Sequence, residues 1–296
     1  MNERSYDAQR KSDKRAAERD ITIPSIVDHS RRIEKESDDA AWLLFYLPDV
    51  FNLPFTADQL QEIKEVGHCL RYGTKKAIAD RRGGGKTSIV RYLILKYMLT
   101  KECPFALYVA ASDGKAEQSE RSIKRRLQLG CKEKNRTFIP TTTLGEDYPF
   151  ECSVAAYVSR APARAANVTT DGGTQIHVQW AGDQLILPSI EDASANASDA
   201  WRRWMIKPGQ LGAILLATGI TGSALQGANV LDMRPSFLVL DDLDKRDSLA
   251  ADRNKTSTAT GAVVGKIEEI IEKTIAGMRG QGEKMGQVMP RDCKGD

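Results

Sequence analysis

The 296-residue chain is predicted to form an α/β fold, with a mostly parallel sheet flanked by helices. Short apolar runs typical of buried strands alternate along it with longer segments that carry apolar residues at helical spacing. Such alternation favours a parallel sheet, because each return to the same edge requires a crossover connection. A glycine-rich loop between a strand and a helix adds a third observation, since that arrangement is typical of a phosphate-binding site.

Composition sets broad limits on the class of protein. Hydrophobic residues make up 41% and charged residues 28%, as in ordinary globular domains. No apolar run is long enough for a membrane helix, and the charged N-terminus does not resemble a secretory signal. The net charge of +3 neither requires nor excludes a nucleic-acid partner. The three histidines lie far apart, which argues against a histidine-based metal site. An odd number of cysteines without a C-x-x-C pair indicates a reduced, intracellular protein: Cys69, Cys103, Cys131, Cys152 and Cys293.

The N-terminal region is predicted to be an arm followed by helices. Residues 1–37 carry charges of mixed sign and are expected to form a frayed arm or an exposed helix, leaving residues 38–296 as one domain. The aromatic-rich stretch 39–52 is expected to dock on the main body. A helix over 56–73 follows, with Thr56 as its cap, Gly73 as its end and four apolar residues at helical spacing: Leu60, Ile63, Val66 and Leu70.

The remaining segments supply the sheet and its connections. Strands are predicted at 75–80, 103–112, 212–219, 235–247 and 283–290. Helices are predicted at 87–99, 116–130 and 257–280, the second closed by Gly130. Two alternating runs around Ala-Gly-Asp predict a hairpin over 173–189, and residues 160–172 are expected to form a loop rich in small residues.

The glycine loop reads RRGGGKT over residues 81–87. It departs from the pattern G-x-x-x-x-G-K-[ST] because Asp80 stands where the first glycine is expected. Lys86 is predicted to reach the β and γ phosphates of ATP, and the Thr87 hydroxyl to bind Mg²⁺. Three glycines would let backbone amides approach the phosphates: Gly83, Gly84 and Gly85. The alternative is a glycine-rich turn that happens to precede a lysine.

An apolar strand that ends in two acids supplies the second half of the predicted site. The run FLVLDD would deliver Asp241 and Asp242 to the carboxyl edge of the sheet, where the glycine loop also opens. Asp241 is predicted to hold Mg²⁺, directly or through water, and Asp242 to orient or deprotonate the attacking water. The alternative is that both acids simply end a strand in solvent.

The strand at 103–112 lies between the loop and the acidic strand. An inserted strand together with a second acid predicts a P-loop NTPase of the additional-strand, catalytic-carboxylate type.

Other polar residues allow two interpretations each. Gln59 precedes the loop strand and could read the adenine edge of ATP, because its amide both donates and accepts hydrogen bonds. An exposed helix glutamine is the alternative. The basic clusters at 124–126 and 202–203 could contact DNA phosphates or could form solvated helix faces.

These residues resemble the large terminase subunits of tailed bacteriophages. Phosphate loops of that family lack the first glycine and carry an arginine beside the glycines, as RRGGGKT does. Segments similar to the family cover roughly residues 39–290, and the stretch GAILLATGITGSALQGANVLDMRPSFLVLDDLDKRDS is the closest match. The resemblance implies that Arg82 stabilises the γ-phosphate in cis, so that Arg82, Lys86 and Asp242 would form the catalytic set.

The resemblance also implies a biological setting. The protein would be an ATPase motor that uses ATP and Mg²⁺ to move double-stranded DNA into a procapsid, and it would bind DNA phosphates without sequence preference. The implied partners are a small terminase subunit, a portal protein and further copies of the chain in a ring. The implied location is the host cytoplasm, with no membrane.

Three departures from the family matter. Gln226-Gly227 stands where the family often has arginine before the glycine, and Asp242 stands where many members have glutamate. After the last predicted strand the chain reads RDCKGD, where the family continues into a coupling motif and a nuclease domain. The expectation is therefore an ATPase part without nuclease activity. Two alternatives stay open, a nucleotide-binding or assembly module without independent turnover and a helicase-like DNA translocase.

Overall fold

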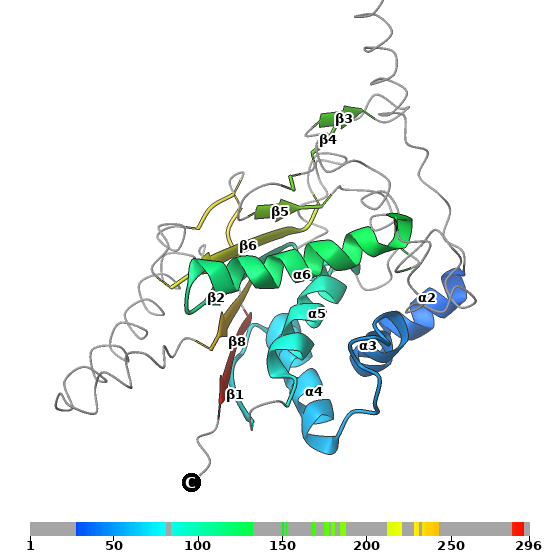
Figure 1. The fold of residues 1–296 in the computed structure, drawn as a ribbon, viewed down its shortest axis with the longest axis vertical. Helices are drawn as coiled ribbons and strands as arrows, with labels where there is room; N and C mark the ends of the chain where they lie inside the picture. The colour runs from blue at the N-terminus through cyan, green and yellow to red at the C-terminus, as the bar shows by residue number, and fades with distance from the viewer. Residues whose placement is uncertain are drawn as a thin grey trace, which may run out of the picture.

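The computed structural model is an α/β fold, in which a mixed six-stranded sheet is flanked by helices (Figure 1). The residues that it describes are 28–80, 84–132, 150, 152, 167–169, 175–177, 179–180, 184–187, 212–220, 228–230, 233–242 and 286–292.

The sheet is parallel except at one edge. Its order is β1-β8-β7-β2-β6-β5, and only β5 runs antiparallel to its neighbour. The strands are β1 (Lys75–Asp80), β2 (Phe105–Ala110), β5 (Gln184–Ile186), β6 (Ile214–Gly219), β7 (Phe237–Asp241) and β8 (Gly286–Asp292). Parallel strands end at a common edge, and the register pairs Ala110 of β2 with both Gly219 of β6 and Asp241 of β7. The carboxyl ends of these strands therefore meet where the site is predicted.

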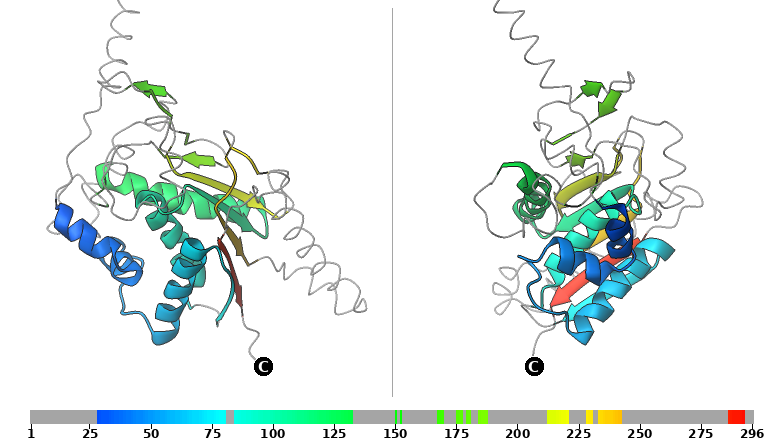
Figure 2. Two further views of the ribbon diagram at one scale, coloured as in Figure 1. Left: turned by 180° about the vertical axis from the view of Figure 1, so that it is seen from behind. Right: turned by 90° about the vertical axis from the view of Figure 1, so that its right-hand side faces the viewer.

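The position of β8 corrects one expectation. We expected the strand at 103–112 to be the one inserted between the loop strand and the acidic strand. Instead β8 fills that place, pairing with β1 on one side and β7 on the other, while β2 lies beyond β7 (Figure 2). Sequence order could not reveal this, because β8 comes from a segment far downstream of both of its partners.

Five helices are described on the N-terminal side of the fold. They are α2 (His29–Glu36), α3 (Asp39–Tyr46), α4 (Ala57–Tyr72), α5 (Lys86–Leu99) and α6 (Asp113–Lys132). Helix α4 begins and ends as predicted, with a capping box between Thr56 and Gln59 and with Gly73 in the left-handed conformation at φ 64°. Helix α5 lies between α4 and α6 (Figure 1), and α3 packs against both α4 and α5.

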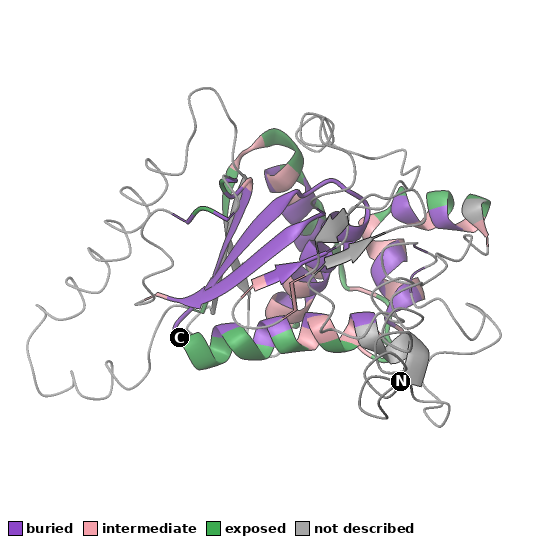
Figure 3. Ribbon diagram, turned by 90° about the horizontal axis from the view of Figure 1, so that it is seen from above, coloured by how far each residue is buried: buried purple, intermediate pink, exposed green. Residues whose placement is uncertain are grey.

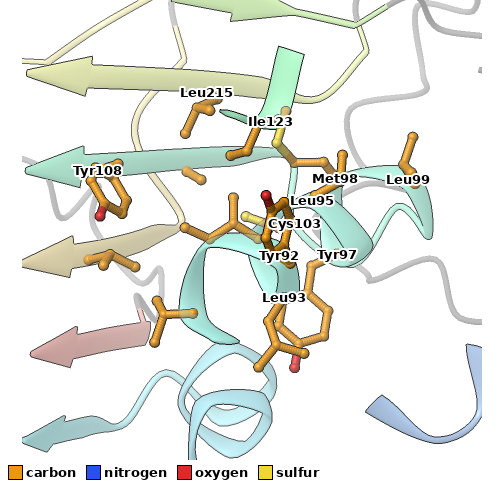
Figure 4. Close-up of a cluster of buried hydrophobic side chains, with 14 of the residues drawn as sticks. Tyr92, Leu93, Leu95, Tyr97, Met98, Leu99, Cys103, Tyr108, Ile123 and Leu215 are labelled. Carbon is orange, nitrogen blue, oxygen red and sulfur yellow. The ribbon is translucent and has the colours of Figure 1, made fainter. Parts of the chain in front are cut away.

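Alternate residues of the central strands divide the core into two layers. One set, with Tyr108, Leu215 and Val239, packs against the helices, and α5 is buried nearly all round (Figure 4). The other set, with Leu107, Leu216 and Leu240, packs with Ala228, Val230 and Met233 on the opposite face. The central strands are buried along their whole length, as expected for a parallel sheet covered on both faces (Figure 3).

The N-terminal region differs from the sequence-based expectation in two places. Helix α2 lies inside the expected charged arm, yet its Arg32 and Glu36 are only 1% and 5% exposed, so the folded body includes it. Leu60 is 38% exposed, whereas Ile63 and Val66 of the same predicted stripe are buried.

Three further differences lie in the connections. A short strand, β3 (Asn167–Thr169), stands in the expected loop and pairs with β4 (Gln175–His177). The hairpin expected over 173–189 is therefore only partly formed, through an antiparallel bridge between Gln179 and Ile186. Helix α6 runs past Gly130 to Lys132. The helix predicted at 257–280 lies outside the described residues.

Candidate functional site

The glycine loop leads directly into α5. Gly85 is the N-cap of this helix and adopts φ 87°, a left-handed conformation that costs a glycine little. Lys86 opens the helix and is only 7% exposed. The end of the loop is fixed from α4, because Gln59 Nε2 donates a hydrogen bond of 2.8 Å to the Gly84 carbonyl oxygen. The predicted loop residues Arg81, Arg82 and Gly83 lie outside the described residues.

Thr87 and Asp241 meet at the first turn of α5. The Thr87 hydroxyl donates to Asp241 Oδ1 over 2.9 Å, which joins residues 154 positions apart in the chain. Asp241 ends β7 and is 8% exposed, so its carboxylate lies almost out of water. The structure thus brings together the two residues predicted to bind Mg²⁺.

A second hydroxyl holds the other oxygen of this carboxylate. Tyr108, on β2, donates a short hydrogen bond to Asp241 Oδ2. Burial, together with the charge of Asp241 and the hydrogen bond to it, raises the pKa of Tyr108 far above its usual range, so the phenol stays protonated. Behind it, Ser119 on α6 donates to the Tyr108 oxygen over 3.2 Å, and Arg91 on α5 donates to Ser119 over 3.0 Å.

Asp242 follows directly and faces solvent. Its φ of 42° lies in the left-handed region, which is unusual for a residue other than glycine. Lys115, near the start of α6, donates to Asp242 Oδ2 over 3.2 Å, and both side chains are about half exposed. The predicted water-orienting carboxylate is therefore exposed beside Asp241 and next to a cation.

The start of α6 is held against the same edge of the sheet. Asp113 Oδ1 accepts a hydrogen bond of 2.7 Å from the backbone N–H of Gly219, at the end of β6. A β-carbon at Gly219 would lie 2.5 Å from the Asp113 nitrogen, so only glycine allows this approach. This contact fixes the helix that carries Lys115 and Ser119.

Gln59 has a structural role that the sequence did not suggest. Its Oε1 accepts from the Thr56 backbone N–H over 3.0 Å in the capping box, while its Nε2 holds Gly84. One amide hydrogen and one carbonyl lone pair remain. The side chain thus lies beside the loop, where a residue that binds the adenine base of ATP would have to lie. Its binding to adenine stays a prediction.

The basic cluster at 124–126 is mostly engaged within the protein. Lys124 pairs with Glu120 over 2.7 Å and Arg126 pairs with Asp49, leaving Arg125 as the exposed member. The second cluster, 202–203, lies outside the described residues.

The oxygen atoms at the site match the preferences of Mg²⁺. Within the described part of the chain, no group of three or more His, Cys, Asp or Glu could hold a metal ion. Mg²⁺ at nucleotide sites is held by one or two protein oxygens, with substrate phosphates and water completing its octahedron. A threonine hydroxyl and an aspartate carboxylate 2.9 Å apart therefore fit it.

Three side chains at the site were not anticipated from the sequence. Tyr108 lies in an apolar strand where its ring explains its presence, and Ser119 and Lys115 lie on a helix rich in polar residues. Only the paired register of β2 and β7 brings the phenol to the acid. A tyrosine inside an otherwise apolar buried run was the one available signal, since its hydroxyl needs a partner.

Comparison with known proteins adds no relative. Neither the protein-family models nor the curated proteins give a match to this chain. Among the described residues, every helix is too short or too polar to cross a lipid bilayer.

Proposed function

We propose that this protein is a P-loop ATPase of the additional-strand, catalytic-carboxylate type that drives viral DNA packaging. The observation that carries the ATPase proposal is the Thr87–Asp241 hydrogen bond. This hydrogen bond joins Thr87, at the end of the glycine-lysine-threonine loop, to the acid that ends β7. Such an arrangement suits a nucleotide-bound Mg²⁺.

The strand order supports the same class. β8 stands between the loop strand β1 and the acidic strand β7, which is the place of the additional strand in that division of P-loop ATPases. A second acid, Asp242, follows the first directly, as the class requires.

Each residue of the proposed site would have its own role in ATP hydrolysis. Amides of Gly84 and Gly85 and the ammonium of Lys86 would hold the phosphates at the positive end of α5. Thr87 and Asp241 would hold Mg²⁺, which offsets charge on the β and γ phosphates. Asp242 would orient water for in-line attack and accept its proton, and Arg82 would stabilise the charge that develops on the γ-phosphate.

The packaging role is the finer proposal, and it is supported by the residues that resemble large terminase subunits. Double-stranded DNA, a small terminase subunit, a portal protein and a ring of copies are the partners that follow from it. The host cytoplasm is the corresponding location. Since Lys124 and Arg126 are engaged within the protein, Arg125 is the member of its cluster best placed for a DNA phosphate.

ATP hydrolysis by the purified chain, with and without duplex DNA, tests the proposal. We expect Asp242→Asn to lower kcat by about 10²–10⁴-fold while nucleotide still binds, because only water activation is lost. Lys86→Ala should lose nucleotide affinity as well. Glu117→Gln, at an exposed carboxylate paired with Arg121 on α6, is the control and should behave as wild type.

Other outcomes would favour the alternatives. Nucleotide binding through Lys86 without any turnover favours a binding or assembly module. Turnover stimulated by single-stranded DNA more than by duplex favours a helicase-like translocase. Turnover that survives both Lys86→Ala and Asp242→Asn would overturn the ATPase site itself.

A further inference from the structure

A chain of hydrogen bonds leads from the helices to the carboxylate of Asp241. Arg91 on α5 donates to Ser119 on α6, and Ser119 donates to the hydroxyl of Tyr108 on β2. Tyr108 then donates to Asp241 Oδ2. Three elements, α5, α6 and β2, thus converge on one carboxylate of β7, and the hydrogen-bond chain ends at Oδ2 while Thr87 bonds to Oδ1.

The direction of these hydrogen bonds fixes how the carboxylate is oriented. Because Ser119 donates to the phenol oxygen, the phenol hydrogen is free to point at Asp241. The Tyr108 hydrogen bond occupies Oδ2, so Oδ1 is the oxygen turned toward the first turn of α5. Groups that bond to a metal-binding side chain in this way hold its orientation and tune its affinity for the metal.

We propose that Tyr108 is a positioning residue for the metal-binding carboxylate of Asp241, with Ser119 and Arg91 holding Tyr108 in turn. The inference rests on the proposed function and deepens it by naming what makes Oδ1 a ligand. In this role Tyr108 needs no contact with the nucleotide or the metal. It acts through Asp241, by preventing the rotation that would carry Oδ1 away from Thr87.

The burial of the phenol argues for this role over simple packing. Tyr108 is 2% exposed in an apolar layer with Leu215 and Val239, where a phenylalanine would fill the same space without a hydroxyl to satisfy (Figure 4). A buried hydroxyl costs free energy unless it is hydrogen-bonded. Here it is bonded twice, once as donor to the acid and once as acceptor from Ser119.

The test compares nucleotide affinity with and without the metal. A fluorescent non-hydrolysable ATP analogue is titrated into the full chain in Mg²⁺ and again in EDTA, and the ratio of the two affinities reports what the metal contributes. We expect Tyr108→Phe to lower that ratio by about 10–100-fold while leaving the affinity in EDTA within twofold of wild type. Ser119→Ala should lower the ratio less.

Tyr92→Phe is the matched control. Tyr92 is also a buried tyrosine, 5% exposed on α5, but its ring packs against Phe51, and the hydrogen bonds to Asp241 come from Thr87 and Tyr108. Its metal-dependent ratio should equal that of wild type. Thermal unfolding of each variant confirms that it is folded.

The possible results separate the two proposals. A ratio for Tyr108→Phe within twofold of wild type overturns the positioning role alone. If Tyr108→Phe does not fold, Ser119→Ala decides, and an unchanged ratio there overturns the role equally. If the wild type binds no analogue in either condition, the proposed function fails and this inference fails with it.

Discussion

Two aspartates whose side chains are largely shielded from water lie at opposite ends of α5 and have contrasting partners. The Asp39 side chain is 9% exposed and lies near the C-terminal part of the helix, while Asp241 is 8% exposed and lies at its first turn. Asp39 accepts hydrogen bonds from two cations and one phenol, whereas the hydrogen bonds to Asp241 come from two neutral hydroxyls.

The Asp39 cluster joins α3, α4 and α5. Lys96 is fully buried and donates to Asp39 and to the Glu36 carbonyl oxygen, the latter over 2.8 Å. Arg71 bridges Asp39 and Glu102, at 3.3 Å and 2.8 Å. Every acid in the cluster faces a cation, so its charge is compensated within the fold.

The difference fits a structural role for Asp39 and the proposed metal-binding role for Asp241. Lysine and arginine can only donate hydrogen bonds, so they fix Asp39 as an anion. Hydroxyls orient Asp241 while leaving its charge available to an incoming cation, which is what a nucleotide-bound metal requires.

The same substitution at both aspartates should give the greatest difference in unfolding free energy. Asp39→Asn should cost about 3–5 kcal/mol of unfolding free energy, because it would remove the charge that compensates buried Lys96, and the new amide group would face cations that cannot accept a hydrogen bond. Asp241→Asn should cost about 0.5–1.5 kcal/mol, since a hydroxyl can turn and accept instead. Urea unfolding measures both. Equal costs would remove the distinction between the two aspartates.

Lowering the pH gives a second test of the difference between Asp39 and Asp241. Burial by itself raises the pKa of Asp39, but the charges of Lys96 and Arg71 and their hydrogen bonds outweigh it and lower that pKa below the ordinary 3.8. Asp39 therefore stabilises the fold fully above the unfolded-state pKa and loses that contribution as pH falls through the lower folded-state value.

Unfolding free energy measured from pH 5 downward should fall more steeply for wild type than for Asp39→Asn in the region below about 4. Asp38→Asn removes an exposed carboxylate at the N-cap of the same helix and serves as the control for general acid effects. Parallel curves for wild type and Asp39→Asn would show that Asp39 is not the titrating group.

The exposed ion pair between Lys115 and Asp242 should contribute least to the unfolding free energy. Lys115→Ala removes the partner of Asp242, but both side chains are about half exposed, so water and salt screen the interaction. We expect a change in unfolding free energy of less than about 0.5 kcal/mol, measured by urea unfolding at low and high salt. A loss above 1 kcal/mol that disappears in salt would show that Lys115 stabilises the site edge more than its exposure suggests.

The bounds of the helices and strands were more predictable from the sequence than the pairing between them. The strands β1, β2, β6 and β8 and the helices α4, α5 and α6 were predicted close to their observed bounds, because periodicity, caps and glycines are local signals. β7 lies within the longer strand predicted at 235–247. The meeting of Thr87 with Asp241 also followed from local patterns, since loop and acids both belong at the carboxyl edge.

What the sequence could not predict depends on pairings across long distances. Lys96 lies in an apolar helix, and nothing near it in the chain indicates that Asp39 would compensate its charge. Tyr108 reached Asp241 only through the register of β2 with β7. The insertion of β8 was missed for the same reason.

The place of β8 has a consequence for how the protein is made. β1, the strand that leads into the glycine loop, has β8 as its neighbour in the sheet, and β8 is also what joins β1 to β7. Translation at about 5–20 residues per second would deliver β8 roughly 10–40 s after β1 leaves the ribosome. During that interval β1 lacks its neighbour in the sheet, so the proposed nucleotide site can assemble only late in synthesis, when β8 joins β1 to β7.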